Sequence, residues 1–252
     1  VSTPVKTFSV GFDYRHDELN EAAFTAKYLG CDHHEIPCRA EDVALLPRIV
    51  HHMDEPMGDA IVIPMYQLSR AAKKEVTVIL TGEGGDEVFG GYLFHKLMWF
   101  GDLYRKFMPN FLQQRVILPA LSGVPAGVMN TLFQYPAYLG DRGKQKVLDY
   151  LQLLDPGQID RAYCHLISLF DFRDKSDLYT RKFSEQLSED QKNPVEDILT
   201  SPVHGVPLTP NGHYLNRLLR LQFDHWLPDN MLLRQDKTGM ANAIEGRVPY
   251  LD

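Results

Sequence analysis

Three glycines and three carboxylates lie within seven residues of this 252-residue chain, in the segment TGEGGDE at 81–87. The glycines allow a tight turn and a close approach by a ligand; they are Gly82, Gly84 and Gly85. The carboxylates repel one another unless a cation or a helix N-terminus offsets them; they are Glu83, Asp86 and Glu87. Mg²⁺ prefers one or two carboxylates together with phosphate oxygens, so the segment predicts the phosphate and metal end of a nucleotide site. The alternative is an acidic turn in which Asp86 caps a helix.

Two other segments concentrate charge. The first, DEPMGDAIVIP at 54–64, is either part of the site or an ordinary solvated loop, and its acids are Asp54, Glu55 and Asp59. The second, at 234–251, is either a set of charges buried near an anionic ligand or a salt-bridged helix surface. Its charged residues are Asp236, Lys237, Glu245 and Arg247. Both alternatives stay open for each segment.

Strands and helices that could position these residues alternate in the first third of the chain. β-Branched and aromatic residues predict strands at 6–12 and 34–38, and apolar periodicity predicts helices at 17–29, 41–53 and 64–74. The apolar run VTVIL at 76–80 is typical of a central parallel strand covered on both faces. Alternation of this kind predicts an α/β fold with a doubly wound parallel sheet. Such sheets bind ligands at the carboxyl ends of their strands, where TGEGGDE follows VTVIL.

After Tyr92 the pattern becomes helical, and no further strand is predicted. We therefore divide the chain into a partial α/β domain at 1–92 and a helical part at 93–252. The proline-rich stretch 184–212 is expected to be a long loop. The apolar stretch 116–133 contains prolines and polar residues, which favour a buried helix pair with a turn near Gly123 over a membrane span.

Composition excludes several classes of protein. A net charge of −7 disfavours a nucleic-acid partner and an anionic membrane surface. The three cysteines form no C-x-x-C pair, which favours reduced thiols in the cytoplasm. The histidine pairs at 33–34 and 51–52 lack metal-binding spacing. A G-x-S-x-G elbow and a Walker loop are both absent, which leaves a serine hydrolase or a Walker-type ATPase without support.

Three motifs, taken in order, resemble the asparagine synthetase family. LTGEGGDEVFGGY at 80–92 is similar to its signature SGEG-[AS]-DE-[LV]-FGGY. MDEPMGDAIVIPMYQLSR at 53–70 is similar to its DEP-x-x-D-x-x-x-x-P loop. WLPDNMLLRQDKTGMANAIEGRVPYLD at 226–252 resembles its WLPDD…D-[RK]-x-x-M-x-x-x-x-E-x-RVPFLD stretch. The resemblance therefore spans nearly the whole chain.

This resemblance implies an α/β fold of the ATP-pyrophosphatase type, similar to the adenine nucleotide alpha hydrolases, followed by an all-helical extension. It implies a ligase that uses ATP and Mg²⁺. ATP adenylates the side-chain carboxylate of aspartate and pyrophosphate leaves; ammonia then gives asparagine and AMP. The ammonia would come from glutamine, in an N-terminal glutaminase domain absent from this chain. The resemblance leaves a homodimer open.

Carried over residue by residue, the resemblance also implies roles. Val10 would contact adenine through its backbone. Glu83 would sit near the aspartyl-AMP, and Asp86 would serve the magnesium and pyrophosphate end. Asp224 is a weaker catalytic candidate from the helical part. The nucleotide would lie along Thr81, Gly82 and Gly84, with Thr81 where the family has serine.

Two parts of the family pattern do not occur in the chain. The pyrophosphate loop S-G-G-x-D-S is expected upstream of Val1, and a lysine in a K-x-x-F/GF segment is expected after Asp252. We therefore expect an internal fragment that is inactive by itself and binds ATP weakly. Two other functions stay open: amidation of a carboxylate other than aspartate, and a catalytically incomplete interaction module.

Overall fold

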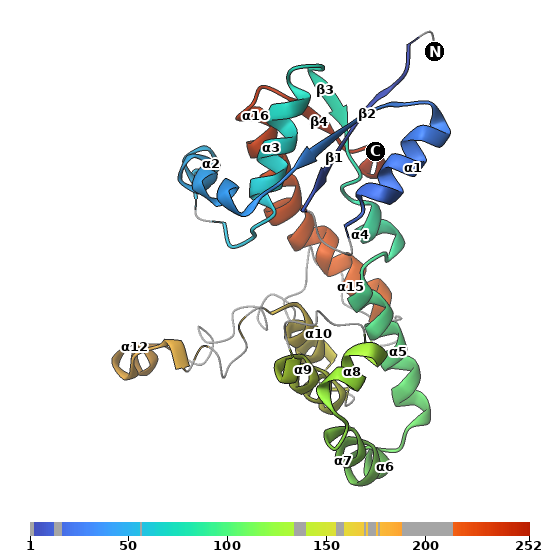
Figure 1. Cartoon of the computed structure of the whole chain (residues 1–252). Coiled ribbons are helices and arrows are strands. Elements are labelled where there is room, and N and C mark those ends of the chain that lie inside the picture. The colour runs from blue at the N-terminus through green and yellow to red at the C-terminus, as the bar shows by residue number, and fades with distance from the viewer. Residues whose placement is uncertain are drawn as a thin grey trace. The chain divides into compact units, whose positions relative to one another are not determined.

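A computed structural model describes residues 3–12, 17–55, 57–133, 140–154, 159–168, 170, 175, 177–187 and 214–252 (Figure 1). Contacts divide the chain into two compact units, the first made of residues 1–88 and 222–252 and the second of residues 89–221. Each unit is described below by itself. The division at residue 92 expected from the sequence stays a prediction.

The first unit begins with a parallel pair of strands, β1 (Lys6–Gly11) and β2 (Asp32–Pro37), with Val10 opposite Ile36. Helix α1 (Leu19–Leu29) connects them and ends at Gly30. The strand predicted at 6–12 and the helix predicted at 17–29 are therefore confirmed, and the second strand begins two residues earlier than predicted.

A second parallel pair joins distant parts of the chain, β3 (Val78–Leu80) and β4 (Glu245–Arg247). The prediction of no strand after Tyr92 is wrong, because a three-residue strand of sequence EGR carries no apolar alternation. The prediction that VTVIL is covered on both faces is also wrong, since Leu80 keeps 74% of its surface exposed. An apolar run records which side chains could be buried, but not what covers them.

The strands are parallel, as predicted, but those described form two two-stranded sheets instead of one doubly wound sheet. The alternation of strands and helices predicts the direction of each strand. It does not predict which strands become neighbours, because that depends on backbone hydrogen bonds between distant residues. The pairing of β3 with β4 is such a case.

Helices complete the first unit. They are α2 (Leu46–Met53), α3 (Val62–Ala72), α4 (Gly85–Phe89) and α16 (Leu233–Met240), with 3-10 turns at Ala40–Leu45 and Pro249–Leu251. A π-helical segment, Gln222–Leu232, precedes α16 and contains Pro228. Proline lacks the N–H that an α-helix needs and clashes with the preceding turn, which favours such a wider helix.

The core of this unit lies between α2 and α3, where Ile49, Met53, Val62, Ile63 and Tyr66 are buried. Helix α16 packs against both helices, and α3 also packs against β1. Two contacts fasten the end of α16 to α3: Asn242 Nδ2 donates to Tyr66 O at 3.4 Å, and Lys73 Nζ donates to Ala243 O at 2.9 Å. The segment after residue 222 is therefore part of the same core as α3.

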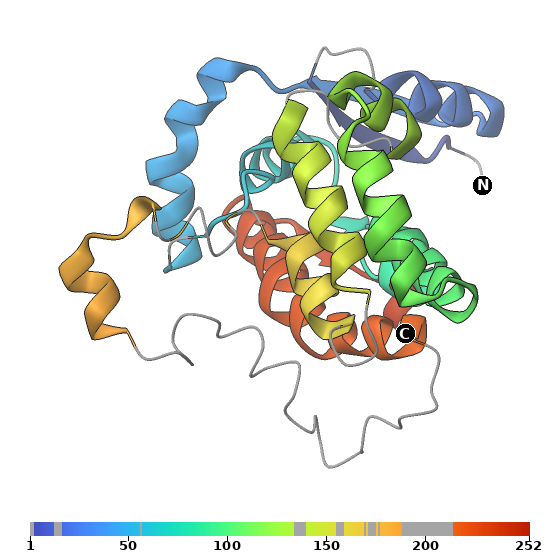
Figure 2. The ribbon, with the colours of Figure 1, turned by 90° about the horizontal axis from the view of Figure 1, so that it is seen from below.

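The second unit is helical throughout its described residues (Figure 2). Its helices are α5 (Leu93–Phe107), α6 (Asn110–Leu112), α7 (Leu118–Ser122), α8 (Ala126–Phe133), α9 (Gly140–Gln152), α10 (Ile159–Ile167), α12 (Arg181–Gln186) and α15 (Tyr214–Leu221), with a π-helical turn at Gln113–Ile117. Its core includes Met98, Leu118, Leu151 and Leu218.

The helices and the turn predicted at 116–133 are confirmed, because α7 ends at Ser122, next to Gly123, and α8 begins at Ala126. The predicted burial of this pair is wrong, since Val116, Val128 and Leu132 are 50%, 51% and 65% exposed. The predicted loop at 184–212 lies mostly outside the described residues. Among the described helices, none is long and apolar enough to cross a membrane.

Truncation of the α2 side chain that packs against α3 should destabilise the first unit. Ile49 is 0% exposed, so Ile49→Ala should lower the free energy of unfolding by about 3 kcal/mol through lost burial and the cavity left behind. Urea unfolding followed by circular dichroism measures the change. The control Val43→Ala, at a position 56% exposed, should change it by less than about 0.5 kcal/mol.

Candidate functional site

The loop after β3 is fixed to the C-terminal part of the first unit. The backbone N–H of Thr81 donates to Arg247 O at 2.9 Å, which extends the β3–β4 pairing by one bond. Its hydroxyl donates to Gln235 Oε1 on α16 at 3.1 Å. The loop therefore takes its position from α16 and β4.

A tight turn follows at Gly82–Gly85. The N–H of Gly85 donates to Gly82 O at 3.1 Å, and Gly84 has φ of 89° at the third position of the turn. A positive φ there is what a type II turn requires and what glycine supplies. A Cβ on Gly84 would also lie 2.4 Å from Leu251 Cδ2. The turn presents Glu83 at its second position.

The Glu83 carboxyl group is half-buried, and burial is the largest cause that raises its pKa. The positive charge of Arg234 acts in the opposite direction. The carboxylates of Glu87, Asp86 and Asp59 raise the pKa further. Glu83 thus binds its proton more tightly than an ordinary glutamate, which is the direction of shift that favours general acid or base catalysis.

The cation next to Glu83 is itself buried. Arg234 is 7% exposed, and its Nη1 donates to Asp59 Oδ2 and, at 3.0 Å, to Asn230 Oδ1. Its Nε atom is buried and has no hydrogen-bond partner among the described residues. A buried donor left unpaired costs about 1–3 kcal/mol, and more when it is charged.

The charged pairs farther along the same segment are exposed. Lys237 Nζ lies 2.6 Å from Asp54 Oδ2, and Arg247 Nε lies 2.8 Å from Glu245 Oε1. The Asp54 partner raises the pKa of Lys237, and Lys237 lowers that of Asp54. Lys237 lies on α16, whereas Glu245 and Arg247 both lie on strand β4. The roles of these charged residues stay open. The Asp59 end of the 54–64 loop is different, because it pairs with a buried arginine.

Arg234 and Gln235 are not among the residues predicted from the sequence. A signal was present, since Asn230, Arg234 and Thr238 recur every four residues, which places polar side chains on one helix face. The Thr238 hydroxyl donates to Arg234 O at 2.7 Å. Polar side chains repeated on one helix face, two of which are buried, indicate a polar contact on that face.

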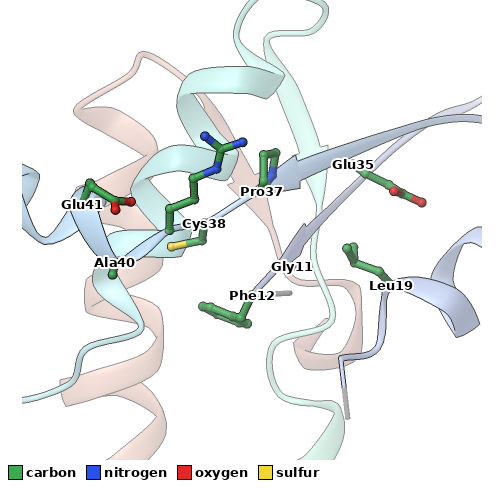
Figure 3. Close-up of a pocket in the computed structure, with 9 residues that line it drawn as sticks. Gly11, Phe12, Leu19, Glu35, Pro37, Cys38, Ala40 and Glu41 are labelled. Atoms are coloured by element: carbon green, nitrogen blue, oxygen red, sulfur yellow. The ribbon is translucent and has the colours of Figure 1, made fainter. Parts of the chain in front are cut away.

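A cavity of 610 Å³ opens where the first pair of strands ends (Figure 3). Gly11 and Phe12 line it at the end of β1, and Pro37 and Cys38 line it at the end of β2. This is the edge at which parallel sheets bind ligands, and the volume suits a small molecule. Burial raises the pKa of the Cys38 thiol, and the charged residues Glu35, Arg39 and Glu41 line the same cavity.

Three further predicted residues lie on other elements of the first unit. Val10 precedes the cavity residues of β1 and lines a broader groove of 910 Å³ beside α1. Asp86 is exposed in the first turn of α4. Asp224 lies in the π-helical segment. The roles of these three residues stay predictions.

Metal ligands do not converge in the part of the chain that the structure describes: no three His, Cys, Asp or Glu side chains form a metal-binding group there. A magnesium ion held by nucleotide phosphates needs only one or two carboxylates from the protein. Asp86, with Glu83 three residues before it, fits that requirement.

The fold and the site define an α/β protein with a buried charge cluster and a cavity at the carboxyl ends of its parallel strands. The sequence model of the family described as asparagine synthase matches residues 1–252. The chain belongs to the asparagine synthase family.

Curated relatives agree with this family. The chain is 30% identical over 256 residues to asparagine synthetase [glutamine-hydrolyzing] 1 of Bacillus subtilis, covering 98% of this chain and 35% of the relative. It is 30% identical over 251 residues to a putative asparagine synthetase of Mycobacterium bovis, with 98% and 33% covered. A putative asparagine synthetase of Methanocaldococcus jannaschii is 40% identical over 108 residues, 42% of this chain and 21% of the relative. The chain spans about a third of the length of the first two.

Loss of the Asp59 carboxylate should leave the Arg234 guanidinium buried without its counter-ion. Asp59→Asn should therefore lower the free energy of unfolding by about 3 kcal/mol, the lower end for a broken buried pair because Asp59 is one-third exposed. Urea unfolding measures this. Asp54→Asn, which removes an exposed partner, serves as the matched control and should have a much smaller effect.

Glu83 should make the stability of the chain depend on pH. The pKa of Glu83 is raised in the folded state, so the folded protein loses its proton less readily than the unfolded chain. The free energy of unfolding therefore falls as the pH rises from about 4.5 through the folded pKa. Glu83→Gln removes that cost. The variant should match the wild type in urea unfolding at about pH 4 and be more stable at about pH 8. A difference that is the same at both pH values would contradict the assignment.

Proposed function

We propose that this chain is the synthetase part of a glutamine-dependent asparagine synthetase. ATP adenylates the side-chain carboxylate of aspartate and releases pyrophosphate. Ammonia then attacks the aspartyl-AMP and gives asparagine and AMP. Membership of the asparagine synthase family supports the proposal. One structural observation carries it: the half-buried carboxyl group of Glu83 follows the parallel strand β3 and interacts electrostatically with the buried Arg234.

We also propose the ATP-pyrophosphatase type of fold. Two observations support it: both strand pairs are parallel, and helix α1 connects β1 to β2. The cavity at the ends of these two strands would take the adenosine, with the backbone of Val10 next to the base. The nucleotide would continue along Thr81, Gly82 and Gly84. Of the two glycines, Gly82 is exposed and open to a ligand, whereas Gly84 is buried against Leu251.

Glu83 has a role that its environment can support. Ammonia becomes positively charged when it attacks the acyl carbon, so a nearby base must take a proton from it before AMP leaves. A carboxylate whose pKa burial has raised is a better base than an exposed one. We assign that proton transfer to Glu83, close to the acyl carbon of the aspartyl-AMP.

Magnesium, when bound, would neutralise charge on the departing pyrophosphate. Asp86 is the residue that we expect to contact it, because its carboxylate is exposed three residues after Glu83. Asp224 is retained as a weaker catalytic candidate.

The nitrogen source and the compartment are part of the same proposal. Ammonia would come from glutamine in an N-terminal glutaminase domain; the Bacillus subtilis and Mycobacterium bovis relatives are described as glutamine-hydrolyzing. We propose the cytoplasm, because the three cysteines are widely spaced and form no C-x-x-C pair. A homodimer stays a prediction.

Exchange of labelled pyrophosphate into ATP tests the adenylation step without the glutaminase. In the full-length gene product the exchange should require aspartate and Mg²⁺. Glu83→Gln keeps the side-chain shape but removes the charge. It should reduce the rate of ATP-dependent asparagine formation by at least about 100-fold. The matched control Glu185→Gln alters an exposed carboxylate of α12 and should leave the activity unchanged.

Aspartate-dependent exchange and asparagine formation that are both normal in Glu83→Gln would overturn the assignment of the site. Exchange that needs a different carboxylate, tested with a panel of amino acids and peptides, would keep adenylation and replace the acceptor. No exchange with any acceptor would favour the interaction module.

A further inference from the structure

Arg234 has more hydrogen-bonding capacity than the fold uses. The Nη1 atom alone donates to both Asp59 and Asn230, which are sufficient to anchor the guanidinium on one side. The Nε atom is buried and unpartnered among the described residues. Native proteins rarely leave a buried charged donor without an acceptor, so an acceptor is expected in another state of the site.

The loop after β3 carries a group that could accept a hydrogen bond from Arg234 Nε, namely the Glu83 carboxylate. Gln235, the next residue on α16, accepts the hydroxyl hydrogen of Thr81, and Glu83 follows two residues later. Arg234 is also the strongest charge that acts on Glu83. A carboxylate and the side of a guanidinium can form two parallel hydrogen bonds, in which Nε is one of the donors.

We propose that Arg234 is a positioning residue, whose Nε–H donates to the Glu83 carboxylate when nucleotide and acceptor are bound. Asp59 and Asn230 hold the opposite side of the guanidinium and so fix its direction. Catalytic hydrogen bonds are often loose in a ligand-free enzyme and tighten in the reactant complex. The inference rests on the role proposed for Glu83, but the contact itself can be measured without turnover.

A purely structural role of Arg234 gives different expectations. If Arg234 only neutralised Asp59, lysine would replace it, because a single ammonium can pair with one buried carboxylate. A positioning role needs the planar guanidinium, which reaches two acceptors on different sides, and lysine lacks this geometry. The variants Arg234→Lys and Arg234→Gln therefore separate the two roles.

Kinetics in the full-length gene product provide the first test, with ATP, MgCl₂, aspartate and ammonium chloride. Arg234→Gln should lower kcat for asparagine formation by about 100-fold and change KM for ATP by less than about threefold. Arg234→Lys should recover the unfolding midpoint but not kcat. The double variant Arg234→Gln with Glu83→Gln should be no slower than Glu83→Gln alone, since both changes remove one contact.

An exposed pair in α12 provides matched controls. Arg181 is 93% exposed and lies 2.8 Å from Glu185, so Arg181→Gln removes the same charge from a surface. This variant should retain wild-type kcat. The cycle of Arg181→Gln and Glu185→Gln should show no coupling in kcat.

Nuclear magnetic resonance of the arginine ¹⁵Nε–¹H groups provides the second test. The signal that disappears in Arg234→Lys is assigned to Arg234. It should shift when ATP, MgCl₂ and aspartate are added, and the shift should be absent in Glu83→Gln. If the exchange reaction fails but this Glu83-dependent shift occurs, the proposed reaction is wrong and the contact stands.

Two results would overturn the inference. One is recovery of both kcat and stability by Arg234→Lys. The other is an Arg234 signal that responds to ligands in the same way with and without the Glu83 carboxylate.

Discussion

The burial of one guanidinium constrains the first unit. A charge as deeply buried as Arg234 must have a partner, and Asp59 supplies it from a loop 175 residues earlier in the sequence. The pair connects Asp59 of the 54–64 segment to α16. The neighbouring Gln235 accepts a hydrogen bond from Thr81, at the start of the turn after β3. The three charged segments noticed in the sequence therefore converge on one helix.

The sequence predicts local structure well where one residue pattern decides it. Apolar periodicity locates α1 and α3 within about two residues, and proline and glycine locate the break at Gly123. It predicts β4 poorly, since three residues of sequence EGR become a strand only through backbone bonds to β3. Strand pairing between such distant segments depends on the whole packing of the unit, which no local pattern encodes.

Only part of the site could be predicted from the sequence, because the rest depends on contacts between distant segments. The turn that carries Glu83 follows from glycines at fixed positions, so a motif reveals it. The environment of Glu83 depends on which cation packs against it, and the exposed Lys237 looks as suitable in the sequence as the buried Arg234. Burial distinguishes the two cations. The exposed Lys237–Asp54 pair contributes little to stability, whereas the buried Arg234–Asp59 pair fixes the direction of the guanidinium and so affects the proton affinity of Glu83.

The bond from Thr81 to Arg247 has a consequence for the synthesis of the protein. The two residues are 166 positions apart, so the turn that carries Glu83 cannot take its final shape until the chain up to Arg247 has left the ribosome. Closing so long a loop is entropically costly and slow compared with forming the local helices. A nascent chain would already contain folded helices while its glycine turn remained unformed, so the site would be completed last.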